Sequence, residues 1–215
     1  MKMKKAIVLL VVLLTSCAHF DLSSNVINNN QGIVLLRGST TSFSYTATAF
    51  AIERDAKGTL LLTNKHACVD DAVLSIKDTS NNEYKAIVVK RAQFEDLCLI
   101  HTDAILPVLK LGNKDASYGQ FVVVDGCGRG ICEQIVTGYA GKYIEIKNDD
   151  AGIYAREQLL TTPIYPGNSG SCVMDASGRV VGIINLGIPD APTEAIMIPI
   201  SSVLRFLDSS DDVIK

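Results

Sequence analysis

The sequence predicts an all-β protein, built as two packed six-stranded antiparallel β-barrels with a short C-terminal helix. Short apolar or alternating runs recur along the chain, and Gly, Asn, Asp or Pro closes each of them. Many short strands at close spacing, separated by turn residues, are typical of all-β sandwiches and barrels. The turn-rich segment LGNKDASYG (111–119) divides the strands into two sets, which predict barrels over about residues 32–112 and 119–200.

The strands follow in order from Gly32. The first set is expected at residues 33–37, 43–52, 59–64, 72–76, 83–91 and 96–101. The second set is expected at residues 120–126, 133–139, 142–146, 157–162, 171–175, 179–186 and 194–200. Residues 201–208 (SSVLRFLD) have the apolar spacing of a helix and close the chain. We therefore expect one folded domain over residues 32–215.

Residues 1–16 have the features of an export signal. Three lysines precede the nine-residue apolar run AIVLLVVLL (6–14), which is too short to span a bilayer because a span needs about 20 apolar residues. The alternative is a buried N-terminal strand or helix. The polar, Asn- and Ser-rich residues 17–31 predict a flexible tether between this signal and the fold.

The end of the signal, Leu-Thr-Ser-Cys17, resembles the lipobox of bacterial lipoproteins, in which the cysteine is acylated. This resemblance implies a lipid anchor at Cys17 that holds the protein in the bacterial cell envelope. Ala18 follows where Asp is associated with inner-membrane retention, which favours the outer membrane, facing the periplasm. The alternative is an ordinary cleaved signal.

Charge and cysteine content exclude several classes of function. Without the three signal lysines the chain has 17 basic and 23 acidic residues, a net charge of −6, and it has no basic run. Nucleic acid is therefore not an expected partner. Five cysteines follow Cys17, and in an oxidising envelope they tend to pair, with one left over. No CxxC pair or His-rich cluster indicates a metal site, and we expect no cofactor.

Three residues together indicate nucleophilic catalysis. Ser169 lies in YPGNSGSCV, where Gly167 and Gly170 allow a tight loop with converging N–H groups. Taken alone, this segment could be a hairpin turn. His66 follows an apolar strand, and Asp96 opens another. A serine nucleophile needs a base and a carboxylate that orients the base, and these two residues supply them.

The chain order is His, Asp, Ser, with 30 residues from His66 to Asp96 and 73 from Asp96 to Ser169. This order, and the division between the two strand sets, match the chymotrypsin arrangement and not the subtilisin or α/β-hydrolase orders. Over residues 33–205 the sequence resembles the chymotrypsin-fold (trypsin-like) serine peptidases, most closely the HtrA/DegP-type peptidase domain. The segments that carry the resemblance are TATAFAI (46–52), LLTNKHA, EDLCLI, PGNSGSCVMDASGRVVGII and IMIPIS (196–201).

The resemblance implies roles for individual residues. Ser169 would be the nucleophile, His66 the general base and then acid, and Asp96 the orienting carboxylate. The oxyanion hole would lie at Gly167, Asn168 and Ser169, with Asn168 shaping the loop. Substrate-binding residues would be Pro163 and Ile164 at the specificity pocket, Ile184, Asn185 and Leu186 along the substrate backbone, and Gly187 in the pocket wall.

The apolar lining of this pocket favours small or medium apolar side chains before the scissile bond; Asp190 is the nearest acid. Ser171 and Cys172 depart from the family's usual Gly and Pro, which could reduce activity. No PDZ-like domain follows, so the regulated oligomer of HtrA proteins is not implied, and the oligomeric state stays open.

The positions of the cysteines are compatible with the arrangement that the resemblance implies. Cys127 and Cys132 flank a glycine-containing turn and are a candidate disulfide. Cys68 and Cys98 each lie two residues beyond a triad member and form a second candidate pair, which leaves Cys172 free. The sequence thus predicts a serine endopeptidase that hydrolyses envelope proteins through an acyl-enzyme intermediate. The alternative is a weak or inactive protease-fold binding module anchored at the membrane.

Overall fold

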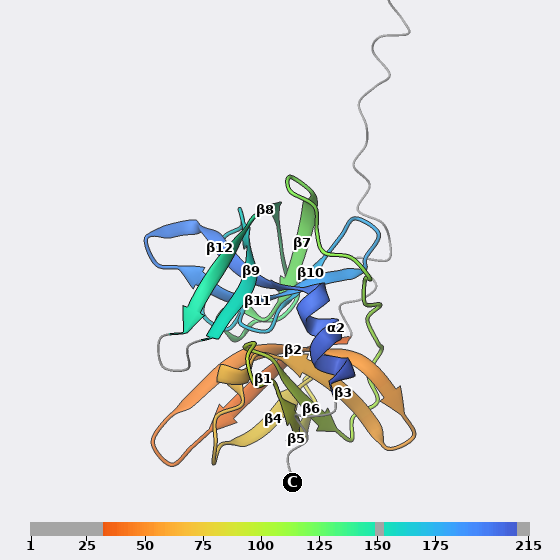
Figure 1. Cartoon of the computed structure of the whole chain (residues 1–215). Coiled ribbons are helices and arrows are strands. Elements are labelled where there is room, and N and C mark those ends of the chain that lie inside the picture. Colours follow the sequence, from red (N-terminus) through yellow and green to blue (C-terminus); the bar gives the residue numbers. More distant parts are fainter. Residues whose placement is uncertain (1–31, 149–152, 210–215) are drawn as a thin grey trace, which may run out of the picture.

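The computed structural model describes residues 32–148 and 153–209 (Figure 1). The predicted signal, the anchor at Cys17 and the tether lie outside the described residues. Among the residues described, no helix is long and apolar enough to cross a membrane.

The first half of the chain forms a closed barrel with the strand order β1-β2-β3-β6-β5-β4. All neighbouring strands in it are antiparallel. Its strands are β1 (Ile33–Ser39), β2 (Ser44–Asp55), β3 (Gly58–Thr63), β4 (Val73–Lys77), β5 (Glu83–Arg91) and β6 (Cys98–Thr102).

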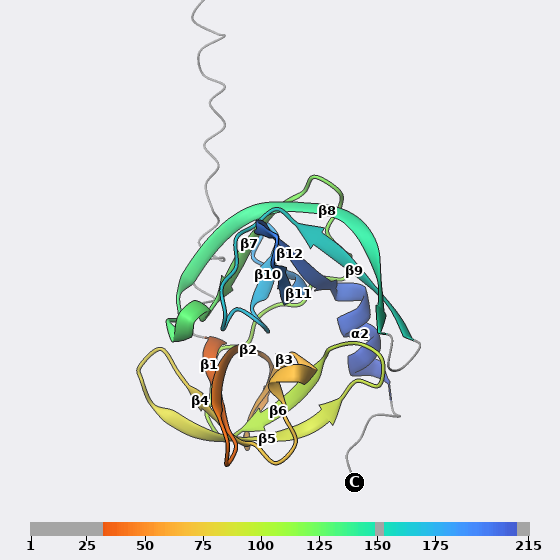
Figure 2. The same ribbon diagram turned by 90° about the vertical axis from the view of Figure 1, so that its left-hand side faces the viewer.

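The second half forms a second closed antiparallel barrel, with the order β10-β11-β12-β9-β8-β7. The two barrels stack against each other, as Figures 1 and 2 show. This confirms the predicted pair of six-stranded barrels. The strands are β7 (Phe121–Gly126), β8 (Gln134–Asn148), β9 (Ile153–Leu160), β10 (Cys172–Met174), β11 (Val180–Ile188) and β12 (Ala191–Pro199).

One long strand replaces two predicted short ones. The segments expected at 133–139 and 142–146 form the single 15-residue strand β8, which pairs first with β7 and then with β9. The register with β9 shifts between Ala140 and Tyr143. Gly141 makes this bend possible, because a Cβ there would lie only 3.0 Å from Leu159 Cβ. Strand β9 also begins earlier than expected, at Ile153.

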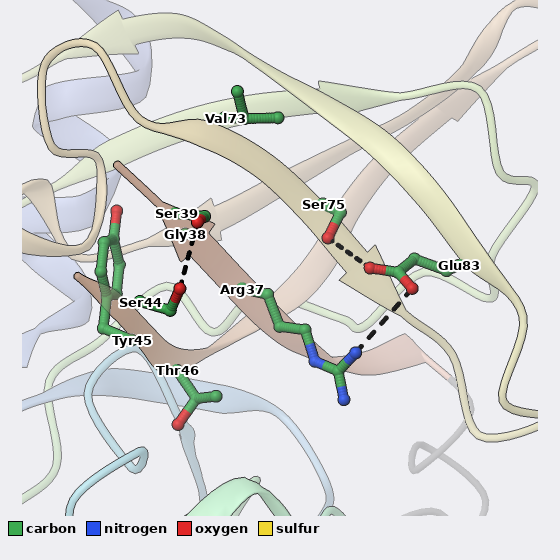
Figure 3. A pocket seen from close by; sticks show the side chains of 9 residues that line it. All are labelled: Arg37, Gly38, Ser39, Ser44, Tyr45, Thr46, Val73, Ser75 and Glu83. Atoms are coloured by element: carbon green, nitrogen blue, oxygen red, sulfur yellow. Dashed lines mark hydrogen bonds and ion pairs between the residues drawn. The ribbon is translucent and has the colours of Figure 1, made fainter. Parts of the chain in front are cut away.

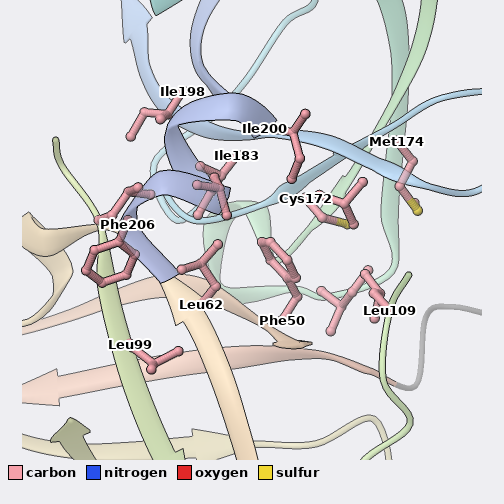
Figure 4. Packing of buried hydrophobic residues seen from close by; sticks show 14 of the residues in the cluster. Phe50, Leu62, Leu99, Leu109, Cys172, Met174, Ile183, Ile198, Ile200 and Phe206 are labelled. Atoms are coloured by element: carbon pink, nitrogen blue, oxygen red, sulfur yellow. The ribbon is translucent and has the colours of Figure 1, made fainter. Parts of the chain in front are cut away.

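The largest described core cluster lies between the barrels. Figure 4 shows side chains from both halves packed together, with Phe50 and Leu62 of the first barrel near Ile183 of the second. Helix α2 (Ile200–Asp208) covers this junction with Phe206, and its Arg205 pairs with Glu95 of the first barrel at 2.7 Å. Burial of these apolar side chains therefore fixes how the two barrels sit relative to each other.

Candidate active site

His66 and Asp96 are brought together by paired strands of the first barrel. His66 lies in a short 3-10 turn, η2 (Lys65–Ala67), just after β3, and Asp96 lies just before β6. Thr63 pairs with Cys98, so the end of one strand faces the start of the other. A disulfide between Cys68 and Cys98 closes the His66 turn onto β6.

The carboxylate of Asp96 contacts His66 twice. One oxygen, Oδ2, lies 2.5 Å from His66 Nδ1, and the other, Oδ1, accepts the backbone N–H of His66 at 2.8 Å. The hydrogen bond that the Asp96 carboxylate accepts from the ring raises the pKa of His66, and burial lowers it. The Asn64 amide donates to the Asp96 carbonyl at 3.0 Å and so fixes the backbone beside the carboxylate. Asp96 therefore fixes both the position and the ring orientation of His66.

Ser169 lies in the loop that leads into β10 of the second barrel. Gly170 follows it with a φ of 84°, and a Cβ there would lie 2.0 Å from the Thr48 carbonyl oxygen. Only glycine allows the loop to approach the first barrel this closely. Within the described chain, the Ser169 hydroxyl donates to the Asn185 carbonyl at 3.3 Å and not to the His66 ring.

Thr48 of β2 connects the first barrel to the Ser169 loop. Its N–H donates to the Ser169 carbonyl at 2.8 Å, and its hydroxyl donates to the Gly167 carbonyl at 2.8 Å. The same hydroxyl oxygen accepts the Cys127 N–H at 2.9 Å. Thr48 is fully buried, so these bonds are shielded from water. The sequence does not predict this role of Thr48, because Thr48 looks like any polar position in an alternating strand.

The orientation of the Ser169 loop leaves two backbone donors free. The Pro166 carbonyl accepts the Arg129 N–H at 2.7 Å, and because a trans peptide is planar, the Gly167 N–H points the opposite way. No described residue accepts a hydrogen bond from the N–H of Gly167 or Ser169. These two N–H groups are available to an oxyanion.

Asn168, which was predicted at the oxyanion hole, does not offer a free backbone donor. Its N–H donates to the Tyr165 carbonyl at 2.9 Å, and its carbonyl accepts the Ser171 N–H at 2.9 Å. Its side chain is buried close to Gly128, where an added Cβ would lie 2.8 Å from Asn168 Oδ1. Asn168 thus shapes the loop without donating to the hole.

A second disulfide, Cys127–Cys132, closes the loop that holds Pro166. This loop carries Arg129, whose guanidinium lies 4.1 Å from the centre of the Tyr165 ring. Both candidate cysteine pairs are therefore bonded in the structure, and Cys172 is a free, buried thiol. Burial raises the pKa of this thiol well above its usual value, so Cys172 is an inert core residue.

Among the predicted substrate-binding residues, Ile184 differs from the others in that both of its backbone groups are already bonded. The backbone N–H and carbonyl of Ile184 both bond the Ser169 loop, at Ser171 and Gly170, so Ile184 supports the loop and cannot pair with a substrate. Leu186 is 41% exposed, and Ile164 packs near Gly187, where an added Cβ would meet Ile164 Cγ1 at 3.2 Å.

The structure also shows a buried carboxylate, bonded to the predicted substrate-binding residue Asn185, that was not predicted. Glu157 of β9 is 3% exposed and accepts the side-chain amide of Asn185. The pKa of Glu157 is raised to about 7, because burial and the charge of Asp96 raise it by more than the Asn185 hydrogen bond lowers it. The only signal in the sequence is an acid at the start of the apolar run EQLLTT.

A pocket of about 440 Å³ lies elsewhere, on the first barrel (Figure 3). It holds an ion pair between Arg37 and Glu83 at 3.8 Å, and Ser75 donates to Glu83 at 2.7 Å. None of His66, Asp96 and Ser169 lines it. The candidate catalytic residues therefore lie where the two barrels meet, and not in this pocket.

Two antiparallel barrels with a histidine and an aspartate from one, and a serine beside free N–H groups from the other, define a serine peptidase of the two-barrel class. The sequence profile described as "Trypsin-like peptidase domain" matches residues 47–183, and the chain belongs to this family.

The relatives include a "Probable periplasmic serine endoprotease DegP-like" of Pseudomonas fluorescens, 32% identical over 57% of this chain and 26% of the relative. Human "Serine protease HTRA4" is 29% identical over 80% of this chain and 36% of its own. The chain thus spans about a quarter to a third of the length of these curated relatives. These similarities show that the chain is homologous to the HtrA/DegP serine proteases.

Solved structures share the fold. The active form of the Rv3671c protease from M. tuberculosis superposes with a TM-score of 0.78, at 18% identity, over 88% of this chain and 85% of that one. The HtrA-type protease AlgW with a tripeptide superposes with a TM-score of 0.73, at 22% identity, over 86% of this chain and 62% of that one.

Proposed function

We propose that this protein is a serine endopeptidase that hydrolyses proteins in the bacterial cell envelope. Ser169 is its nucleophile, His66 its general base and Asp96 the carboxylate that orients the base. The double contact of Asp96 with the backbone N–H and the Nδ1 of His66 is the observation that carries the proposal. It supports a neutral ring protonated on Nδ1, with the Nε2 lone pair left to accept a proton.

In the first half of the reaction, the Ser169 hydroxyl turns from the Asn185 carbonyl to His66 and attacks the scissile carbonyl carbon. Its proton passes to His66 Nε2, and the carbonyl oxygen becomes an oxyanion bonded by the N–H groups of Gly167 and Ser169. Collapse of this intermediate expels the amine, which takes the proton from His66. Losing one oxyanion donor typically costs about 3 kcal/mol of barrier.

In the second half, water attacks the acyl-enzyme ester. His66 takes a proton from the water and returns it to Ser169 Oγ as the acid product leaves. The imidazolium that forms in each half lies against the Asp96 carboxylate, which stabilises it. No metal or cofactor enters these steps.

The substrate is a protein or peptide that lies along β11 in extended form, beside Asn185 and Leu186. Ile164 lies close to Gly187, where an added Cβ would meet Ile164 Cγ1 at 3.2 Å, and we place an apolar specificity pocket at these two residues and Pro163. An Arg buried there without a counter-charge would cost several kcal/mol, so small or medium apolar residues are preferred before the scissile bond.

One observation favours the second candidate, an inactive protease-fold binding module. At rest the Ser169 hydroxyl bonds the Asn185 carbonyl and not His66. In a binding module this arrangement would persist, and Ser169 would have no more nucleophilicity than an ordinary serine.

Labelling with a fluorophosphonate separates the two candidates. We expect one probe per chain, attached at Ser169, because a base-activated serine beside an oxyanion hole reacts with phosphorylating reagents. Mass spectrometry of the digested protein identifies the labelled residue. Ser177→Ala, which removes an exposed hydroxyl in the turn before β11, should label like wild type. A wild-type protein that stays unlabelled would support the binding module.

The envelope location is part of the proposal. Its supports are the signal-like residues 1–16, and the word "periplasmic" in the names of several relatives. The lipid anchor rests on the Leu-Thr-Ser-Cys17 segment alone.

The anchor is tested by partition between detergent and water. Full-length protein made in a lipoprotein-competent bacterium should enter the detergent phase, because each buried CH₂ of an acyl chain contributes about 0.8 kcal/mol. Cys17→Ser should move it to the aqueous phase. Wild-type protein recovered in the aqueous phase, with an N-terminus after Cys17, would show ordinary secretion.

A further inference from the structure

Glu157 is a buried charge that the proposed reaction does not use. It lies on β9 of the second barrel, is 3% exposed, and faces the apolar Ile144 across the β8–β9 pair. A carboxylate without a compensating partner is costly to bury. Its place inside the barrel therefore depends on the contacts that it makes there.

The partner of Glu157 is the side chain of Asn185 on β11. The Asn185 Nδ2 group donates to both carboxylate oxygens, at 2.9 Å and 3.0 Å, and Asn185 itself is 5% exposed. Asn185 sits where the pairing of β11 with β12 shifts, between Ile184 and Leu186. Its own Oδ1 is buried without a partner in the described chain, so the bonds to Glu157 are what orients this side chain.

The other end of Asn185 reaches the reacting serine. The Asn185 carbonyl accepts the Ser169 hydroxyl at 3.3 Å, and it belongs to the segment of β11 along which we place the substrate. We propose that Glu157 is a positioning residue of the peptidase reaction: its buried carboxylate holds the Asn185 side chain and thereby fixes the Asn185 backbone against Ser169 and the substrate. This inference rests on the proposed function.

The ionisation of Glu157 makes the proposal testable through the pH dependence of the activity. Burial raises its pKa to about 7, and the charge of Asp96, from the loop before β6, adds to that rise. Asn185 from β11 and Ile144 from β8 are its uncharged neighbours. Below this pKa the protonated group is a poorer acceptor for the Asn185 amide, so activity should fall for a second reason besides protonation of His66.

Two substitutions at Glu157 and one matched control test the role. Glu157→Ala should lower kcat/KM for peptide hydrolysis about 10- to 100-fold, because small displacements of reacting groups have effects of this order. Gln158→Ala is the control: Gln158 is the next residue of β9, is fully buried, and donates to the Ala116 and Gly141 carbonyls at 3.0 Å each. It should lower the thermal stability but leave kcat/KM near wild type once the protein is folded.

Glu157→Gln keeps the shape of the side chain and one acceptor oxygen. It therefore tests whether Glu157 is a positioning residue even if Glu157→Ala does not fold. We expect near-wild-type activity at high pH, and an acid limb governed by about one ionisation in place of about two. The inference is overturned if Glu157→Gln keeps the wild-type acid limb, or if folded Glu157→Ala hydrolyses like Gln158→Ala. A wild-type protein that neither labels nor hydrolyses would instead refute the proposed function.

Discussion

Ser169→Ala should abolish peptide hydrolysis, with a loss in kcat of roughly 10⁵- to 10⁶-fold. The hydroxyl is the group of Ser169 that attacks the substrate carbonyl in the proposed reaction, and it lies in the loop that holds the free N–H groups of Gly167 and Ser169. The fold should be unaffected, because the hydroxyl makes one long bond at 3.3 Å. The free energy of unfolding should change by less than about 1 kcal/mol.

His66→Ala should cause a similar loss, and the double variant should lose no more than either single one. Triad members act as a unit, so their effects on kcat do not add. The measurement is hydrolysis of a casein-like substrate, with thermal unfolding of each variant in parallel. Wild-type turnover by folded Ser169→Ala would rule out the assignment of the triad.

Asp96→Asn should lower kcat at neutral pH about 10⁴-fold. The geometry gives the reason, because Asp96 Oδ1 accepts the backbone N–H of His66 at 2.8 Å. In the variant the amide oxygen must keep that position, so the amide NH₂ faces His66 Nδ1 and donates to it. The ring then carries its proton on Nε2 and cannot accept one from Ser169.

The pH profile supplies a second readout for this variant. Asp96 raises the pKa of His66 by hydrogen bonding, and the reaction needs neutral His66. Without the carboxylate this pKa falls, so the acid limb of the residual activity should shift to lower pH. Glu95→Gln is the control, since Glu95 is adjacent and pairs with Arg205 at 2.7 Å, away from His66. Equal losses from both substitutions would contradict the role of Asp96.

The barrels could be predicted because each strand is a local pattern with turn residues at both ends. The single long β8 could not, because Gly141 resembles a turn residue and its function as a bend depends on how close Leu159 approaches. The family resemblance brought out His66, Asp96 and Ser169, because the motifs around them are short and contiguous.

The supporting residues could not be predicted, because their partners are distant in sequence. Thr48 reaches Gly167 across 119 positions, and Asn185 reaches Glu157 across 28. A threonine in an alternating strand and a glutamate at the start of one are ordinary in every local respect. Ile184 was expected on the substrate, but its backbone is used by the Ser169 loop, a pairing that appears only in the folded structure.

The contacts of Thr48 also bear on how the protein is made. His66 and Asp96 both belong to the first barrel and can meet once that barrel has folded. Thr48 of the same barrel bonds the carbonyls of Gly167 and Ser169 only after the second barrel has docked on it. A chain in which the second barrel has not docked on the first therefore lacks these contacts, even though it contains His66, Asp96 and Ser169. Helix α2, the last element of the described chain, covers the same junction between the barrels. In the proposed reaction, docking of the second barrel on the first is therefore the step that completes the site.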